Sequence, residues 1–194
     1  MRYKKSSAVA MALLSCVLSA CETEIEITHE YDPTFLISFD AALAESAQDG
    51  RLLLLLATND DNEPRFVVNN SADTQLIFGL NVEDWQGGAE IVIDSSAIGF
   101  PLADLSQVPA GTYYAQALLN RYQDFHLGNG KVVSLAPDRG EGQRWNRKPG
   151  NFYSKPVQIT IGDSTDAPFA LVLDQIIAEI EPPEDTEYVK HISM

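Results

Sequence analysis

The sequence predicts an all-β protein built as a two-layer antiparallel β-sandwich with few short helices. Apolar residues recur mostly with a period of two, the period of strands that bury one face and expose the other. Clusters of turn-forming residues separate these runs along the chain. The composition is that of an ordinary globular protein, with 45% hydrophobic and 21% charged residues among 194. We therefore expect a fold stabilised by an apolar core.

The strands are expected where the alternation is clearest. The alternating runs are Phe35 to Phe39, Leu76 to Val82, Ala89 to Ile93 and Val157 to Ile161, and a strand is also expected in the aromatic-rich run Thr112 to Tyr122. Leu52 to Leu56 is apolar at every position, which predicts a central strand covered on both faces. A further apolar run spans Phe169 to Leu173. Short helices are expected at Ala41 to Gln48, because of its alanines, and around Ile176 to Ile180.

Turn signals agree with a strand-rich body. Asn129-Gly130 predicts a tight two-residue hairpin turn, in which both central residues take positive φ. A body of about 150 residues can bury ~68–70% of its unfolded surface. One domain, residues 34–194, immunoglobulin-like in general architecture, therefore suffices.

The first twenty residues have the pattern of a secretory signal peptide. The basic residues at its start are Arg2, Lys4 and Lys5. The apolar run that follows, Ala8 to Leu18, is shorter than the ~20 residues that a membrane-spanning helix needs. Leu18-Ser19-Ala20-Cys21 resembles the bacterial lipobox, whose cysteine is acylated and becomes the first mature residue. We predict a lipoprotein signal peptide at 1–20 with lipidation at Cys21; the alternative is an ordinary signal peptide whose cleavage site contains a cysteine.

Residues 21–33 are predicted to form an acidic tether. The segment is rich in glutamate, and at ~3.3 Å per extended residue it could hold the body up to ~40 Å from a bilayer. Glu22 follows Cys21 at the position where enterobacterial lipoproteins of the inner membrane carry aspartate. The expected location is therefore the bacterial cell envelope, lipid-anchored, with the outer membrane favoured in a host that has two membranes.

The charge balance excludes some partners. The chain has 13 basic and 28 acidic residues, a formal charge of −15. Such a chain repels a nucleic-acid backbone, so no nucleic-acid partner is expected. Without the signal peptide, 10 basic residues face 28 acidic ones. An anionic leaflet would repel this mature chain, and attachment would depend on acyl chains on Cys21.

Motifs for catalysis or metal binding are not found in the sequence. His29, His126 and His191 lie far apart, and neither H-E-x-x-H nor G-x-S-x-G occurs. Asp60 to Glu63 is the loop richest in oxygen ligands, but it lacks EF-hand spacing and fits a solvated turn better than a calcium site. We predict no catalytic residue, metal or cofactor.

The tract from Asp138 to Pro156 is the strongest candidate for binding. It holds half of the basic residues of the mature chain, interleaved with aromatic residues. The candidate binding residues are Arg139, Arg144, Trp145, Arg147, Lys148 and Tyr153. Guanidinium groups would bind carboxylate or phosphate groups, and aromatic faces would contact sugars or a partner. The alternative is a purely structural loop whose basic residues neutralise nearby acids and whose Trp145 covers the end of the core.

Eight short strings of the body occur in a characteristic order. They are Gly50 to Leu54, Glu63 to Phe66, Thr74-Gln75 with Ile77 to Gly79, Pro109 to Tyr114, Leu118 to Asn120, Gly140 to Asn146, Pro149 to Pro156 and Pro182 to Thr186. Together they resemble the N-terminal, β-rich region of bacterial secreted esterases with an α/β-hydrolase catalytic domain. The resemblance runs from Phe35 to Ile192, and Gly140 to Pro156 is its most specific part.

The resemblance implies an accessory module. In the family the chain continues past a segment like Tyr188 to His191 into the hydrolase domain, whereas this sequence ends at Met194. We therefore expect a noncatalytic, membrane-anchored module that contacts a hydrolase domain. The alternatives are a cell-surface glycan-binding module that uses Trp145 and Tyr153, and a cryptic hydrolase or truncated esterase fragment.

Overall fold

The computed structural model describes residues 32–71, 74–138, 140–162, 167–181, 184–190 and 192. The predicted signal peptide, Cys21, most of the tether and the candidate Arg139 lie outside the described residues. His29 and His191 lie outside them too.

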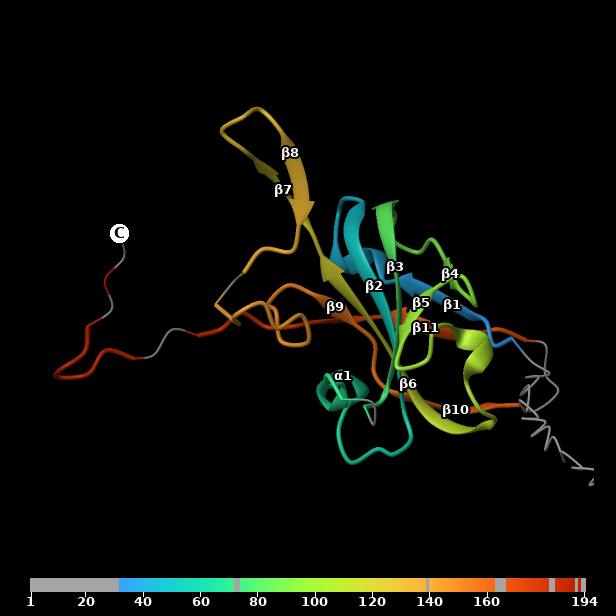
Figure 1. Ribbon diagram of the computed structural model, residues 1–194. Coiled ribbons are helices and arrows are strands. Elements are labelled where there is room, and N and C mark those ends of the chain that lie inside the picture. The colour runs from blue at the N-terminus through green and yellow to red at the C-terminus, as the bar shows by residue number, and fades with distance from the viewer. Residues whose placement is uncertain are drawn as a thin grey trace, which may run out of the picture.

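The described chain forms a mostly β structure, as predicted, in which a small sheet packs against a large one (Figure 1). The large sheet has the order β12-β9-β6-β2-β3-β5, with β10 also paired to β6. Its strands are β2 (Gln48–Ala57), β3 (Leu76–Trp85), β5 (Ile98–Phe100), β6 (Gly111–Arg121), β9 (Phe152–Tyr153), β10 (Val157–Ile161) and β12 (Gln175–Ile176).

The small sheet has the order β11-β1-β4. Its strands are β1 (Phe35–Phe39), β4 (Ile91–Ile93) and β11 (Phe169–Leu173). Among the strand pairs of the described residues, only β1 with β11 is parallel; the others are antiparallel. The main core lies between the two sheets, where phenylalanines of β1 meet leucines of β2 and β6.

Strand β2 is covered on both faces, as its continuous apolar run predicts. It pairs with β3 on one side and β6 on the other. Leu52, Leu54 and Leu56 belong to the main core. Leu53 and Leu55 point the opposite way and form a second buried cluster with Leu118 of β6. Partly buried residues around this outer face, Val68, Trp145 and Ile177 among them, cover the cluster.

The two predicted helices are wrong in extent or kind. Between Ala41 and Gln48 only a three-residue 310 turn forms, Ala41–Leu43, because Asp40 caps it and Gln48 already begins β2. Around Ile176 the chain is β12, which pairs with β9, and the amide of Ile177 continues this pairing to the carbonyl oxygen of Asn151 at 2.9 Å. The open edge of β9 supplies hydrogen-bond partners that so short a helix could not match. The single α-helical turn of the described chain, α1 (Pro64–Val67), lies in the turn-rich stretch between β2 and β3.

Strands β7 (Gln123–His126) and β8 (Val132–Leu135) form a separate hairpin that projects from the sandwich (Figure 1). Its loop is longer than the predicted two-residue turn. Leu127 donates its amide to Lys131, at 2.8 Å, and the Gly130 amide donates to Leu127, at 2.9 Å. Gly130 has φ of 80°, whereas Asn129 does not have positive φ. This is the three-residue hairpin loop, in which one left-handed glycine follows an ordinary turn.

Candidate binding surface of residues 140–156

Asn151 fastens the candidate segment to the large sheet. Its side chain is fully buried beside β6. The amide nitrogen donates to the Trp145 carbonyl at 2.8 Å, and the side-chain oxygen accepts from the Arg121 amide at 3.0 Å. One side chain therefore joins the turn at Trp145 to the end of β6. Because every polar atom of a buried amide needs a partner, this arrangement specifies asparagine at this position.

Gln116 of β6 fastens the other side of the surface. It is fully buried, and its side-chain oxygen accepts from the Arg65 amide at 3.0 Å. Its nitrogen donates to a carboxylate oxygen of Glu63 and to the Ser154 carbonyl, both at 2.9 Å. The first turn of α1 and the chain after β9 are thus both held on the outer face of the sheet.

Arg65 links α1 to the candidate segment. Its Nε lies 2.7 Å from Glu63 Oε2, and its Nη1 donates to the Asn146 carbonyl at 3.2 Å. Asn146 returns a hydrogen bond to the Arg65 carbonyl at 3.0 Å. Partial burial raises the pKa of the Glu63 carboxyl, but hydrogen bonds from Arg65 and Gln116 and the charge of Arg65 outweigh it. The net result is a pKa of Glu63 below its ordinary value.

Guanidinium groups and aromatic rings alternate outward from this junction. The Arg65 guanidinium lies 4.1 Å from the centre of the Tyr153 ring and 4.3 Å from that of Phe66. Arg147 lies 5.1 Å from the centre of the same Phe66 ring. Exposure rises along the series, since Arg65 is buried, Phe66 is 38% exposed and Arg147 is exposed. Such contacts contribute about 0.5–1 kcal/mol at exposed sites and more where they are desolvated.

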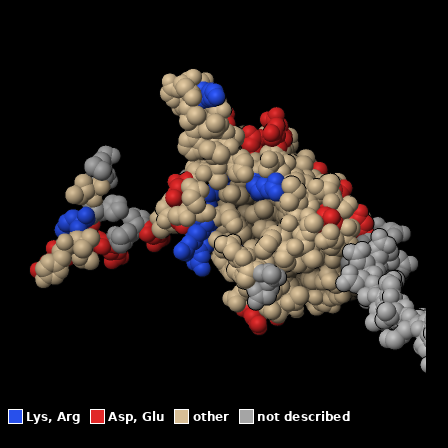
Figure 2. All heavy atoms as spheres, viewed as in Figure 1, with Lys and Arg blue, Asp and Glu red and all other residues tan. Residues whose placement is uncertain are grey.

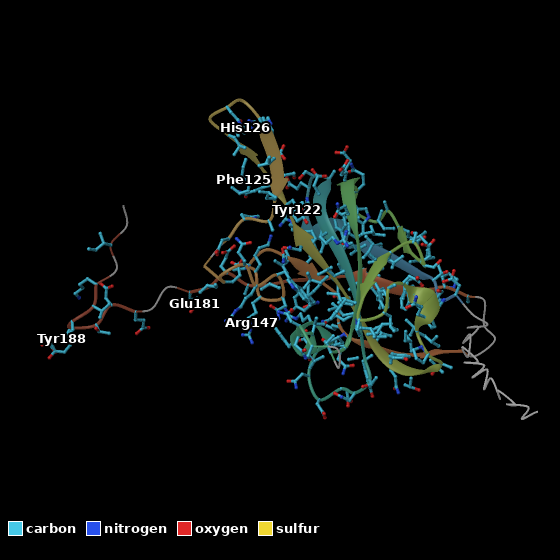
Figure 3. The ribbon with its side chains drawn as sticks, in the orientation of Figure 1. Tyr122, Phe125, His126, Arg147, Glu181 and Tyr188 are labelled. Atoms are coloured by element: carbon cyan, nitrogen blue, oxygen red, sulfur yellow. The ribbon has the colours of Figure 1, made fainter. Side chains whose placement is uncertain are left out.

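Arg144 and Arg147 are the candidate residues that lie on the surface. The amide of Arg147 donates to the Arg144 carbonyl at 2.8 Å, so one turn carries both side chains. Figure 2 shows basic atoms gathered on this side of the molecule, and Figure 3 places Arg147 at its edge. Within the described residues, neither arginine has a carboxylate within 4 Å. We name Phe66, Arg144 and Arg147 the arginine surface.

The other candidates of the tract are packed inward. Trp145 is partly buried against the cluster of Leu53, Leu55 and Leu118. Tyr153 is partly buried and has the Arg65 guanidinium over its ring. Lys148 is 2% exposed, and its ammonium donates to the Arg121 carbonyl. Trp145, Lys148 and Tyr153 therefore fit the structural interpretation of the tract, whereas Arg144 and Arg147 are exposed to solvent.

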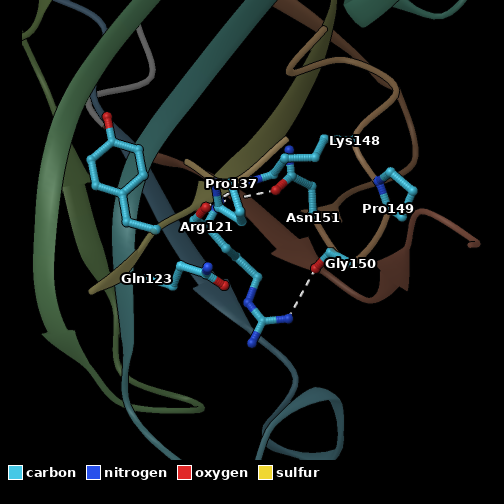
Figure 4. Close-up of a pocket in the computed structure, with 8 residues that line it drawn as sticks. Arg121, Gln123, Pro137, Lys148, Pro149, Gly150 and Asn151 are labelled. Carbon is cyan, nitrogen blue, oxygen red and sulfur yellow. Dashed lines mark hydrogen bonds between the residues drawn. The ribbon is translucent and has the colours of Figure 1, made fainter. Parts of the chain in front are cut away.

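Lys148 also borders a cavity of about 110 Å³ at the end of β6 (Figure 4). Arg121 also lines this cavity, donating from Nε to Gln48 at 2.6 Å and from Nη1 to the Gly150 carbonyl at 3.0 Å. Its guanidinium lies 4.5 Å from the centre of the Phe152 ring. These hydrogen bonds fix the Arg121 side chain, which in turn holds the candidate segment at Gly150.

A second hollow, of about 270 Å³, is acidic. It lies between the β2–β3 ends and the hairpin, and its lining includes Asp49, Glu83, Asp84 and Asp124. Asp49 already accepts the Asp84 amide at 2.7 Å. Within the described ranges, no three His, Cys, Asp or Glu side chains gather closely enough to hold a metal ion. In the Asp60 to Glu63 loop, Glu63 turns instead to Arg65.

Comparisons with protein-family models, curated proteins and solved structures found no match for this chain. Across the part of the chain that the structure describes, no helix has the length and apolar character needed to span a bilayer.

Proposed function

We propose that this protein is a noncatalytic, lipid-anchored module of the bacterial cell envelope that binds carboxylate or phosphate groups of a partner. The arginine surface would be the binding site. The observation that carries the proposal is the outward series of stacked rings and guanidinium groups, which ends in exposed cations on a rigid base.

The electrostatics of the chain favour an anionic ligand at this surface. A protein with a net charge of −15 has an excess of acids with which to neutralise its own arginines. Arg144 and Arg147 nevertheless have no carboxylate within 4 Å among the described residues. A guanidinium presents a planar fork that pairs with carboxylate or phosphate oxygens in a bidentate manner. Phe66 beneath Arg147 orients this fork and restricts its motion.

Cys21 would supply the anchor, and a hydrolase domain of the esterase class is the partner that the resemblance supports.

The partly buried Trp145 and Tyr153 leave the glycan-binding alternative with fewer open aromatic faces than the sequence suggests. Neutral sugars stack on such faces, whereas carboxylates and phosphates pair with the exposed arginines. The anionic ligand is therefore the better match.

Binding assays with defined polymers test the proposed ligand class. The full chain, purified in detergent, is titrated with polygalacturonate and polyphosphate, and with dextran as the neutral control. Loss of one charge-assisted contact in Arg147→Gln should weaken binding about 10-fold or more. Lys131→Gln removes the same charge at the hairpin tip and should leave affinity within about 2-fold. Equal effects of the two variants, or binding to dextran that survives Arg147→Gln, would contradict the proposal.

The anchor has its own test. Intact mass spectrometry of the native product should show acyl groups on Cys21, and Cys21→Ser should remove them and release the chain from membranes. Normal processing of Cys21→Ser with continued sedimentation with membranes would refute the anchor. Ester turnover by the purified chain that resists rigorous removal of contaminants would support the hydrolase alternative.

A further inference from the structure

The β7–β8 hairpin has two chemically different faces. Residues opposite each other in its register share a face, so Gln123, Phe125 and Leu127 lie together with Leu135, Val133 and Lys131. Four of the six are apolar, and Lys131 lies at the loop end of this face. The other face carries Asp124, His126 and Ser134 with one apolar residue, Val132. We name the four apolar residues of the first set, Phe125, Leu127, Val133 and Leu135, the apolar face.

The polar face of the hairpin lies over the rest of the protein. Asp124 and Ser134 line the acidic hollow together with residues from the ends of β2 and β3. The apolar face therefore points away from those strand ends. Leu127 is 43% exposed and Leu135 54% exposed, and Figure 3 shows the hairpin standing clear of the sandwich. Within the described residues, β7 and β8 pair with each other and with no other strand.

An isolated two-stranded hairpin is only marginally stable in water, and its stability rises when an apolar face is covered. The charge of this hairpin indicates what can cover it. Gln123 to Leu135 holds one acid, Asp124, and one fully charged base, Lys131, and is neutral overall. The remainder of the chain carries the whole charge of −15. Two copies that meet through other surfaces bring acidic surfaces together, whereas two apolar faces bring together no acid and only one lysine each, Lys131 at the edge of the face.

We propose that the apolar face is a self-association surface, and that its occupant is the same face of a second copy of this chain. The two hairpins pack face to face about a twofold axis, ~10 Å apart, as stacked sheets do. Four side chains from each copy are buried. This area is well below the ~800 Å² per partner of a standard interface, so we expect micromolar association. The surface is separate from the arginine surface, and the inference does not depend on the proposed ligand.

The oligomeric state of the full chain tests the proposal. Light scattering after size-exclusion chromatography separates protein mass from detergent mass, with micelles in large excess over protein. The wild type should shift from monomer to dimer between about 1 and 200 µM. Because the contact is apolar and the chains repel one another, added salt should strengthen the dimer.

Matched variants locate the contact. Leu127→Ser with Leu135→Ser should raise the dissociation constant about 100-fold, because two exposed side chains are removed from the interface. Val132→Ser changes a 50%-exposed residue on the opposite face and should leave the dimer intact. Unchanged circular dichroism and melting show that all variants are folded. A wild type that stays monomeric, a dimer that survives the double change, or equal loss in Val132→Ser would overturn the inference, and none of these outcomes affects binding to the arginine surface.

Discussion

Replacing Trp145 tests whether the candidate segment 140–156 stabilises the second buried cluster or only lies on the surface of the protein. The indole is partly buried on Leu53, Leu55 and Leu118. A tryptophan buries ~150–250 Å² in a full core, so partial burial here removes on the order of 100–140 Å² from water. At ~25 cal/mol per Å², Trp145→Ala should lower the free energy of unfolding by about 2.5–3.5 kcal/mol. For a domain of this size that corresponds to a fall in melting temperature of about 5–14 °C.

The matched control for this change is Arg144→Ala, one residue earlier and exposed. It should alter the free energy of unfolding by no more than about 0.5 kcal/mol. Urea unfolding followed by fluorescence suits both variants, because the buried Trp85 remains as a reporter. If Trp145→Ala melts within about 2 °C of the wild type, or Arg144→Ala destabilises the protein equally, the second cluster does not support the segment as argued.

Two further predictions concern the junction beneath the arginine surface. Gln116→Leu should lower the free energy of unfolding in urea by about 2–4 kcal/mol, because it leaves the Arg65 amide and the Ser154 carbonyl without their partner. The control Gln158→Leu, on the exposed side of β10, should lower it by under about 0.5 kcal/mol. Similar losses in the two variants would contradict the role given to Gln116. The pKa of Glu63 is lower in the folded protein than in the unfolded chain, so at pH values between the two the unfolded chain binds more protons. The stability that Glu63 contributes is therefore present above its ordinary pKa and is lost as the pH falls through its pKa in the folded protein. Unfolding curves across the acid range should therefore depend less on pH in Glu63→Gln than in the wild type, and parallel curves would refute the assignment.

Period and hydrophobicity predicted β1, β2, β3, β4, β6, β10 and β11, because each of these runs has one or both faces against a core. Leu52 to Leu56 illustrates this, since its odd and even side chains enter two different clusters. The short strands β5 and β9 were not predicted, and β12 was predicted as a helix. The hairpin loop shows the limit of local patterns. Asn129-Gly130 is compatible with a two-residue turn or with a three-residue loop, and the pairing of Leu127 with Lys131 decides between them. That pairing depends on strand register, which the dipeptide does not encode.

The sequence predicted which tract holds the candidate surface, but not how its side chains are arranged in space. Composition pointed to Arg144 and Arg147, yet it could not separate them from the buried Lys148 because all three carry the same charge. Phe66 was missed, since it lies 81 residues before Arg147 and reaches it only when α1 docks on β6. The signal for that docking is the polar Gln116 within the otherwise apolar, buried stretch Ala115 to Leu119 of β6, because a buried strand retains a polar side chain only where it has partners.

The arginine surface and the β7–β8 hairpin would respond in opposite ways to salt, and this follows from where each lies in the fold. The arginine surface rests on a sheet face that is already closed by Trp145 and α1, so it can present charge without moving apolar groups. Its ion pairs with a partner weaken as salt screens them. The hairpin does not lie on a sheet face, and burial of its apolar side chains would stabilise it. Salt that weakens the first proposed contact would screen the repulsion that opposes the second, so under both proposals high salt would favour self-association and the release of an anionic partner.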